Sequence, residues 1–144
     1  NRSEINVYTP LSLWYNIPIL NNKERFYIME NLITETKTLL SLMQDKLHSE
    51  FKFTIEDKYV LEEGRNYIKL VRLCDNGSSS VCGFIVKKSP KKATDNKTDK
   101  SFRVGDMLMA ASYDKPATNY ARGNLFDGYD AKKITWTGIG AMVW

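Results

Sequence analysis

The spacing of apolar positions changes along this chain, from the period of a helix in the first third to the period of a strand beyond it. Between residues 22 and 50, apolar or neutral side chains recur at alternating intervals of three and four, as on one face of an amphipathic helix. These positions are Phe26, Met29, Ile33, Thr36, Leu40, Met43 and Leu47. Asn21 or Asn22 can serve as the N-cap. The pattern predicts a helix over residues 23–50, roughly 40 Å long at 1.5 Å per residue.

A helix of this length is longer than a single small sheet easily covers. One interpretation is that it breaks at residues 34–38, where three β-branched threonines lower the helix propensity. Another is that part of its apolar stripe meets another helix or another copy of the chain. The interpretation that we favour is a core helix that lies across a sheet.

After Phe51 the period falls to two, which is typical of β-strands. Segments rich in Phe, Tyr, Ile, Val and Leu predict strands at residues 52–55, 66–74, 81–88, 102–109 and 133–136. Turn sequences such as Asp75-Asn76-Gly77 separate them, and Gly105-Asp106 interrupts the fourth. One helix followed by a strand-rich remainder predicts an α+β fold with a mainly antiparallel sheet.

Three segments follow neither period. Residues 1–21 carry two prolines among large apolar side chains, which predicts an extended arm ahead of a single domain over residues 22–144. The arm either lies along its own domain or reaches a neighbouring subunit, and both readings stay open. Residues 87–100 hold six lysines and no large apolar residue, which predicts an exposed loop. Between the strands predicted at 102–109 and 133–136, Pro116 and Gly123 prevent long regular structure, so we expect a structured loop that wraps over the sheet, with at most one helical turn.

Cys74 and Cys82 are the only cysteines, and they flank a turn-forming run. If that run closes a symmetric hairpin, the two cysteines face each other across the strands and a disulfide is open to them. Two sulfurs are too few to mark a disulfide scaffold. We therefore favour buried, reduced thiols.

Composition narrows the class of protein. A chain of 144 residues that is 42% hydrophobic and 26% charged is typical of one globular domain with its own core. The formal net charge of +4 gives a mild preference for acidic partners. Apolar stretches fall well short of the ~20 residues that cross a bilayer, so neither a membrane span nor a signal peptide is expected.

The residues that carry catalysis elsewhere do not form a recognisable pattern here. His48 is the only histidine, and its place on the helix predicts a solvent-facing residue. One histidine and two cysteines do not match the spacing of a structural zinc site. The adjacent acids Glu62 and Glu63 point apart if the chain is extended there. We expect no enzymatic activity, no metal, no cofactor and no small-molecule substrate.

Cations and flat rings recur together in the predicted strands and in the covering loop. This combination binds single-stranded nucleic acid, because cations pair with phosphates and rings stack on bases. The alternative is that the rings are core residues and the cations line strand edges. The candidate binding residues are Arg65, Lys69, Arg72, Arg103, Tyr113, Lys115, Tyr120, Arg122 and Trp136, with Tyr67 as a further ring nearby.

A series of short motifs runs through residues 64–138. In order they are GRNYIKLV (64–71), SVCGFI (80–85), GD (105–106), AASYDKPA (110–117), ARGN (121–124) and WTG (136–138). The series resembles small uncharacterised proteins encoded by tailed bacteriophages, with the pattern GRKYIKIV, SVHxFV and GDxxKAASWKAPAKxxRGN. The chain departs from that pattern at Cys82-Gly83, Met109 and Tyr113, so a site that depends on the histidine of the second motif is absent.

The resemblance implies a viral origin and no particular activity. We therefore expect a non-catalytic phage-type accessory protein, in the host cytoplasm or the virion, that binds single-stranded DNA or RNA through a basic, aromatic sheet-and-loop surface. The alternative is a virion structural or assembly protein whose N-terminal arm and helix contact other viral subunits or build a homo-oligomer.

Overall fold

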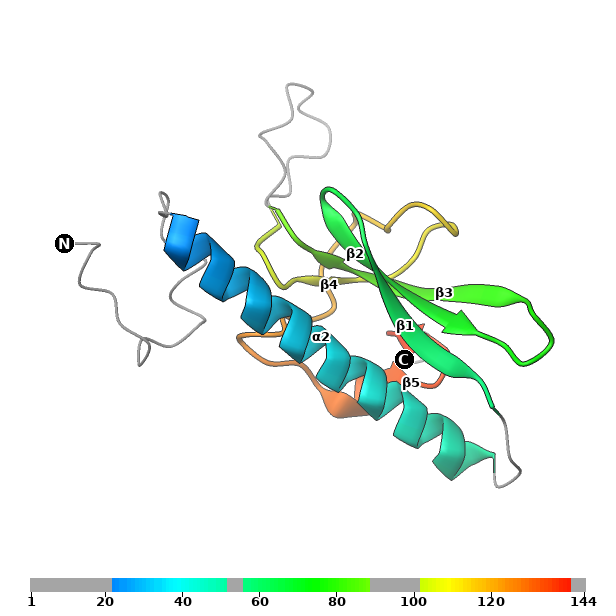
Figure 1. Cartoon of the computed structure of the whole chain (residues 1–144). Coiled ribbons are helices and arrows are strands. Elements are labelled where there is room, and N and C mark those ends of the chain that lie inside the picture. Colours follow the sequence, from blue (N-terminus) through cyan, green and yellow to red (C-terminus); the bar gives the residue numbers. More distant parts are fainter. Residues whose placement is uncertain (1–21, 52–55, 89–101, 141–144) are drawn as a thin grey trace.

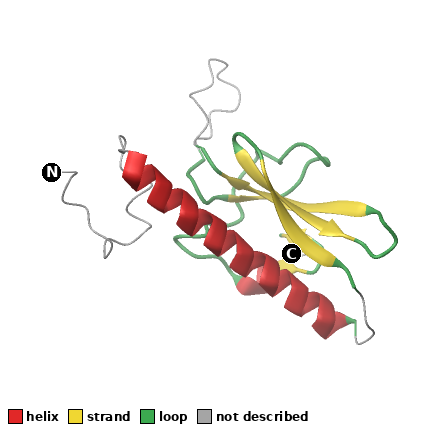
Figure 2. Cartoon of the chain, in the orientation of Figure 1, coloured by secondary structure: helices red, strands yellow, loops and turns green. Residues whose placement is uncertain are grey.

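A single long helix, α2 (Asn22–Glu50), lies across a β-sheet in the computed structural model of the chain (Figure 1). The structure describes residues 22–51, 56–88 and 102–140. The predictions for the arm at 1–21, for the strand at 52–55 and for most of the loop at 87–100 fall outside these residues. Within them the secondary structure is one helix and a set of antiparallel strands, which confirms the predicted α+β class (Figure 2).

The main sheet has four antiparallel strands in chain order: β1 (Lys58–Glu63), β2 (Tyr67–Leu73), β3 (Ser79–Val86) and β4 (Met107–Leu108). A second hairpin, β5 (Ile134–Thr135) and β6 (Gly138–Ile139), follows the short 3-10 helix η3 (Ala131–Lys133). Strands β2 and β3 agree with the prediction to within two residues. Strand β4 is shorter than predicted, and β1 was not predicted because its apolar run is only Tyr59, Val60 and Leu61.

Both faces of the sheet are covered. Helix α2 and the β5–β6 hairpin pack on one face, where the core includes Leu32, Leu39, Met43, Ile68, Leu70, Ile85, Ile134 and Ile139. Phe102 and the loop at residues 109–122 cover the other face, with a smaller core of Phe84, Val86, Phe102 and Leu108. Lys46 joins the helix to the C-terminal segment, because its Nζ donates to the carbonyls of Ala131 and Ile134.

The alternative of a break at residues 34–38 is wrong, and the favoured core helix across a sheet is confirmed, since α2 is continuous for 29 residues. Each threonine in that stretch donates its hydroxyl to the carbonyl four residues earlier. Buried Thr36, for example, bonds the Leu32 oxygen at 2.7 Å. These bonds satisfy the hydroxyls inside the helix, and packing on the sheet outweighs the weak propensity of the segment.

The predicted heptad stripe holds only in the second half of the helix. Its later members, from Thr36 to Leu47, are buried, but Phe26 is 65% exposed and Met29 and Ile33 are only partly buried. Ile28 and Leu32 are buried in their place. A straight helix drifts relative to a seven-residue repeat, and a sheet, unlike a supercoiled partner helix, does not follow that repeat.

The hairpin between β2 and β3 shows that the predicted pairing of Cys74 with Cys82 is wrong. Leu73 pairs with Ser79, and the Cys74 amide donates to the Ser78 carbonyl at 2.8 Å, so Cys74 does not face Cys82. The turn closes early because Gly77, at φ 88°, donates back to the Cys74 carbonyl. Both thiols are free, as favoured, but only Cys82 is buried, while Cys74 is half-buried.

The GD and RGN motifs meet in a buried polar junction. Asp106 and Asn124 are 5% and 3% exposed, and the Asn124 amide donates to Asp106 Oδ1 at 2.9 Å and to the Val104 carbonyl at 3.1 Å. Asn124 Oδ1 accepts from the backbone amides of Phe126 and Asp127. Every polar atom of this amide group therefore has a partner, and the role of Asn124 is to hold the chain reversal against β4.

Candidate nucleic-acid interface

The covering loop, residues 109–122, runs beside β4 on the side of the sheet away from α2. The Ala117 amide donates to the Met109 carbonyl, and the Arg122 amide donates to the Met107 carbonyl, both at 2.7 Å. A tight turn between Ala111 and Lys115 closes its tip. Because backbone bonds hold the loop at both ends, its side chains are presented from a defined frame.

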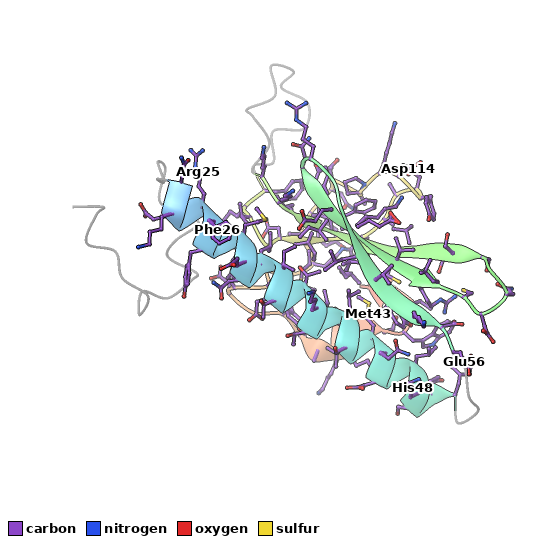
Figure 3. The ribbon with its side chains drawn as sticks, viewed as in Figure 1. Arg25, Phe26, Met43, His48, Glu56 and Asp114 are labelled. Carbon is purple, nitrogen blue, oxygen red and sulfur yellow. The ribbon has the colours of Figure 1, made fainter. Side chains whose placement is uncertain are left out.

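Tyr113 sits near the tip of this loop with a cation over its face. Lys69 of β2 places its Nζ 3.7 Å from the ring centroid and 3.0 Å from Asp114 Oδ1. The tyrosine hydroxyl lies 2.9 Å from Ser79 Oγ. The ring is 43% exposed, whereas the Lys69 side chain is only 14% exposed. Lys69 therefore positions Tyr113 and is balanced by Asp114, which Figure 3 shows away from the helix.

A second ring-and-cation pair lies at the far end of the loop. The Arg122 guanidinium carbon is 4.0 Å from the centroid of Tyr120, and Tyr120 is 51% exposed. Arg122 is itself partly buried, and its Nε has no hydrogen-bond partner among the described residues. The pair offers a flat ring to solvent beside a fixed positive charge.

Lys115 and Arg65 are the two exposed cations of the predicted set that are not held by a described acid. Lys115 is at the tip of the covering loop, and Arg65 is in the turn between β1 and β2. Neither forms an ion pair with any residue that the structure describes. Their charges are available to a phosphate.

Arg72 and Trp136 lie on the opposite face of the sheet and do not join this surface. Successive residues of a strand point to opposite faces, so Arg72 points away from Lys69. Its guanidinium carbon is 4.8 Å from the Trp136 centroid, and its Nε is 3.7 Å from Asp57 Oδ2. Trp136 also meets the Phe51 ring edge to face at 5.0 Å. This cluster seals the end of the helix-side core.

Arg103 is also separate, because its guanidinium pairs with Asp127 at 3.1 Å. The structure thus brings Lys69, Tyr113 and Lys115 together, places Tyr120 and Arg122 on the same loop, and leaves Arg72, Arg103 and Trp136 elsewhere. Sequence reasoning missed Asp114 and Ser79, which hold Lys69 and Tyr113 in place. The sequence around Asp114 and Ser79 does not indicate these roles, because each depends on a contact between the covering loop and a strand that is distant in the chain.

The ionisable groups of the helix-side core do not suggest catalysis. Burial raises the pKa of the Cys82 thiol to about 11 and that of the Tyr59 phenol to about 12. Both groups stay protonated at neutral pH, whereas a catalytic nucleophile or base must be deprotonated to react. His48 is exposed on α2, as predicted, 3.3 Å from the Gln44 amide.

The described residues form neither a metal-binding cluster nor a membrane-spanning helix. None of the described His, Cys, Asp and Glu side chains gather in threes where they could hold a metal ion. The structure also describes no helix that is both long and apolar enough to cross a membrane.

The fold and this surface define an α+β protein with two solvent-facing tyrosines on one loop, one beside Lys69 of β2 and the other beside Arg122. Comparisons of the chain with protein-family models, with curated proteins and with solved structures found no match. The function is therefore argued from the geometry of the surface.

Proposed function

We propose that this protein is a non-catalytic accessory protein of viral origin that binds single-stranded DNA or RNA through the covering loop. The observation that carries the proposal is the pair of tyrosines, 43% and 51% exposed, each with a cation at 3.7 Å or 4.0 Å from its ring centroid. Tyrosine side chains are usually intermediate in burial, and these two rings instead face solvent beside a cation.

Each ring can stack on a base, at ~1–3 kcal/mol per base, whatever the base is. Lys115 and Arg65 are the exposed charges that would meet phosphates, while Lys69 and Arg122 fix the two rings. Arg72, Arg103 and Trp136 have no part in this surface, because their side chains are engaged elsewhere. The result is a sequence-tolerant site for a few nucleotides of an unpaired strand.

The proposal predicts binding that falls steeply with salt. The measurement is fluorescence anisotropy with labelled dT15 and rU15 between 50 and 200 mM salt, where log K should fall by ~0.7 per phosphate contact for each unit of log salt. Lys115→Ala together with Arg65→Ala should weaken binding about tenfold and flatten the slope, because these are the two cations assigned to phosphates. Tyr113→Ala or Tyr120→Ala should weaken binding about tenfold with the slope unchanged.

Lys58→Ala is the matched control, because Lys58 is an exposed lysine on the outer strand β1, away from the covering loop. It should bind like the parent protein. Undetectable binding at micromolar protein, or binding that salt does not weaken, would remove the proposed function.

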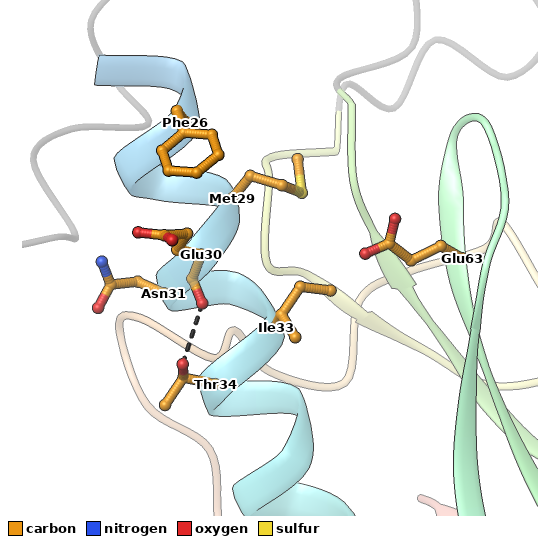
Figure 4. A pocket seen from close by; sticks show the side chains of 7 residues that line it. All are labelled: Phe26, Met29, Glu30, Asn31, Ile33, Thr34 and Glu63. Atoms are coloured by element: carbon orange, nitrogen blue, oxygen red, sulfur yellow. Dashed lines mark hydrogen bonds between the residues drawn. The ribbon is translucent and has the colours of Figure 1, made fainter. Parts of the chain in front are cut away.

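A second candidate function is assembly with other copies, and one observation favours it. Phe26, Met29 and Ile33 line a groove of about 600 Å³, with Glu63 of β1 across its opening (Figure 4). Phe26 is 65% exposed and continues into the half-buried Met29 and Ile33, and a large exposed apolar side chain beside a groove is typical of an interaction site. The occupant that we favour is the arm at residues 1–21 of a neighbouring copy. This segment is rich in leucine and isoleucine and also carries Trp14 and two tyrosines.

This candidate predicts an oligomer that depends on both parts. Light scattering on the full chain should give a defined oligomer, and either deletion of residues 1–21 or Phe26→Asp should dissociate it. Leu73→Asp, at a 43% exposed leucine outside the groove, should leave it intact. A monomer for the full chain at all concentrations would contradict the assembly function.

A further inference from the structure

A second recess opens beside Tyr113, between the β1–β2 turn and the covering loop. Its volume is about 340 Å³, at the lower end of the range for small-ligand pockets. The residues that matter for its chemistry are Glu62, Arg65, Tyr67, Lys69, Phe84 and Asp114. It adjoins the proposed strand-binding loop, since Lys69 and Asp114 belong to both.

The wall of this recess is aromatic and fixed. Phe84 is 3% exposed, and its ring meets that of Tyr67 edge to face, with centroids 6.2 Å apart and planes at 76°. Tyr67 is half-buried and lines the opening. A ring that is held by a buried neighbour is a suitable platform for a flat ligand.

The charges around the recess are balanced. Glu62 pairs with Lys69 across the strands, so both side chains lie on the same face of the sheet as Tyr67. Lys69 is already neutralised by Asp114 at 3.0 Å. Arg65 and Glu62 are both exposed at the rim. The third acid of the lining, Glu63, is paired with Lys87 at 3.5 Å. The recess therefore carries no excess positive charge that would draw a phosphate into it, and it suits the polar edge of an uncharged ring, while Arg65 at the rim remains for the backbone of the strand.

Glu62 is the acceptor that remains for a ligand. It forms no ion pair or hydrogen bond with any residue in the described ranges. A carboxylate only accepts hydrogen bonds, and it accepts two side by side. It lies diagonally across the strands from Tyr67, at a Cα separation of about 7–8 Å, which a base stacked on the ring can span.

We propose that this recess takes one base of the bound strand and prefers guanine, with the base on Tyr67 and its Watson–Crick edge on the Glu62 carboxylate. Guanine alone presents two adjacent donors there, the ring N1–H and the 2-amino group. Adenine and cytosine present an amino group beside an acceptor nitrogen, which a carboxylate repels. This inference rests on the proposed function, because it reads one base of the strand that the covering loop holds.

The test compares three oligonucleotides on the full chain by anisotropy: dT15, the same strand with one central guanine, and the same strand with hypoxanthine, which lacks the 2-amino group. The guanine strand should bind about tenfold tighter than dT15, with the hypoxanthine strand between them. Glu62→Gln should abolish the guanine preference and leave the dT15 affinity within about twofold, because an amide cannot accept both donors.

Glu56→Gln is the control, at an exposed acid near the other end of β1 (Figure 3), and it should keep the guanine preference. Equal affinity of the parent protein for the guanine strand and dT15 would overturn this inference and leave the proposed function intact. A guanine preference that survives Glu62→Gln would overturn it as well. Failure of all three strands to bind would remove both.

Discussion

Gly138→Ala is expected to destabilise the protein by about 3–5 kcal/mol, because two independent costs meet at this residue. Gly138 has φ 131°, which side chains rarely adopt, and a Cβ there would lie 2.1 Å from the Cys82 carbonyl oxygen. The obstacle is backbone of β3, so relief requires the β5–β6 hairpin to move off the sheet. The midpoint of urea unfolding should fall with little change in its slope.

Gly128→Ala separates the two costs. Gly128 has φ 117°, close to that of Gly138, but no atom lies within 4 Å of the position of its Cβ. It should therefore carry only the conformational cost, about 1–3 kcal/mol. If both variants lose the same free energy of unfolding, β6 does not press against β3 as described.

Asn124→Asp is expected to cost about 3–5 kcal/mol at pH 7, because it places a buried carboxylate against Asp106. The new oxygen would face Asp106 Oδ1 and the Val104 carbonyl, where the amide now donates at 2.9 Å and 3.1 Å. The bonds that Asn124 Oδ1 accepts from the next turn would survive. The decrease in the free energy of unfolding therefore measures the loss of the two donated hydrogen bonds together with the repulsion between the two carboxylates.

The same variant should show a pH dependence of known sign. Burial and the neighbouring acid raise the pKa of the introduced carboxyl above its unfolded value of ~3.9. The loss of stability is therefore complete above the raised pKa of the folded state. It fades as the pH falls from there toward the unfolded value, because the folded state takes up a proton first. Unfolding midpoints at pH 7 and pH 4.5 should show the difference from the parent protein narrowing.

Asn76→Asp is the matched control for this prediction. Asn76 Oδ1 also accepts from a backbone amide, that of Ser78 at 3.0 Å, but in an exposed turn. An added charge there remains solvated, so its effect should stay within about 0.5 kcal/mol. Equal losses from Asn76→Asp and Asn124→Asp would show that the junction with Asp106 is not desolvated.

The contrast between the helix and the cysteine hairpin shows what local patterns determine. The helix was predictable to within a residue, since apolar spacing over 29 residues leaves few alternatives. The buried face of the helix was not predictable in the same way. The sequence pattern placed Phe26 in the core, but the structure buries Ile28 and Leu32 there and leaves Phe26 exposed. The cysteine register failed because a turn can close at several residues, and Gly77 selected an earlier closure than symmetry suggested.

The candidate surface shows the same limit. Residue types identified rings and cations, and Lys69 with Tyr113 and Tyr120 with Arg122 do meet. Arg72 and Trp136 also meet, but on the other face, because strand alternation separates Arg72 from Lys69. Asp106 and Asn124 belong to the short motifs GD and ARGN, to which the sequence alone assigns no role, and the structure gives them a structural one.

The sequence by itself determined the α+β class, the long helix, the two central strands and the supply of aromatic rings and cations. These follow from periodicity and composition, which act over a few residues at a time. Only the tertiary structure decided which cations face solvent, which pair with acids, and which rings are buried. Those outcomes depend on contacts between β2, the covering loop and the C-terminal hairpin, which lie far apart in the chain and are brought together by burial of the two cores.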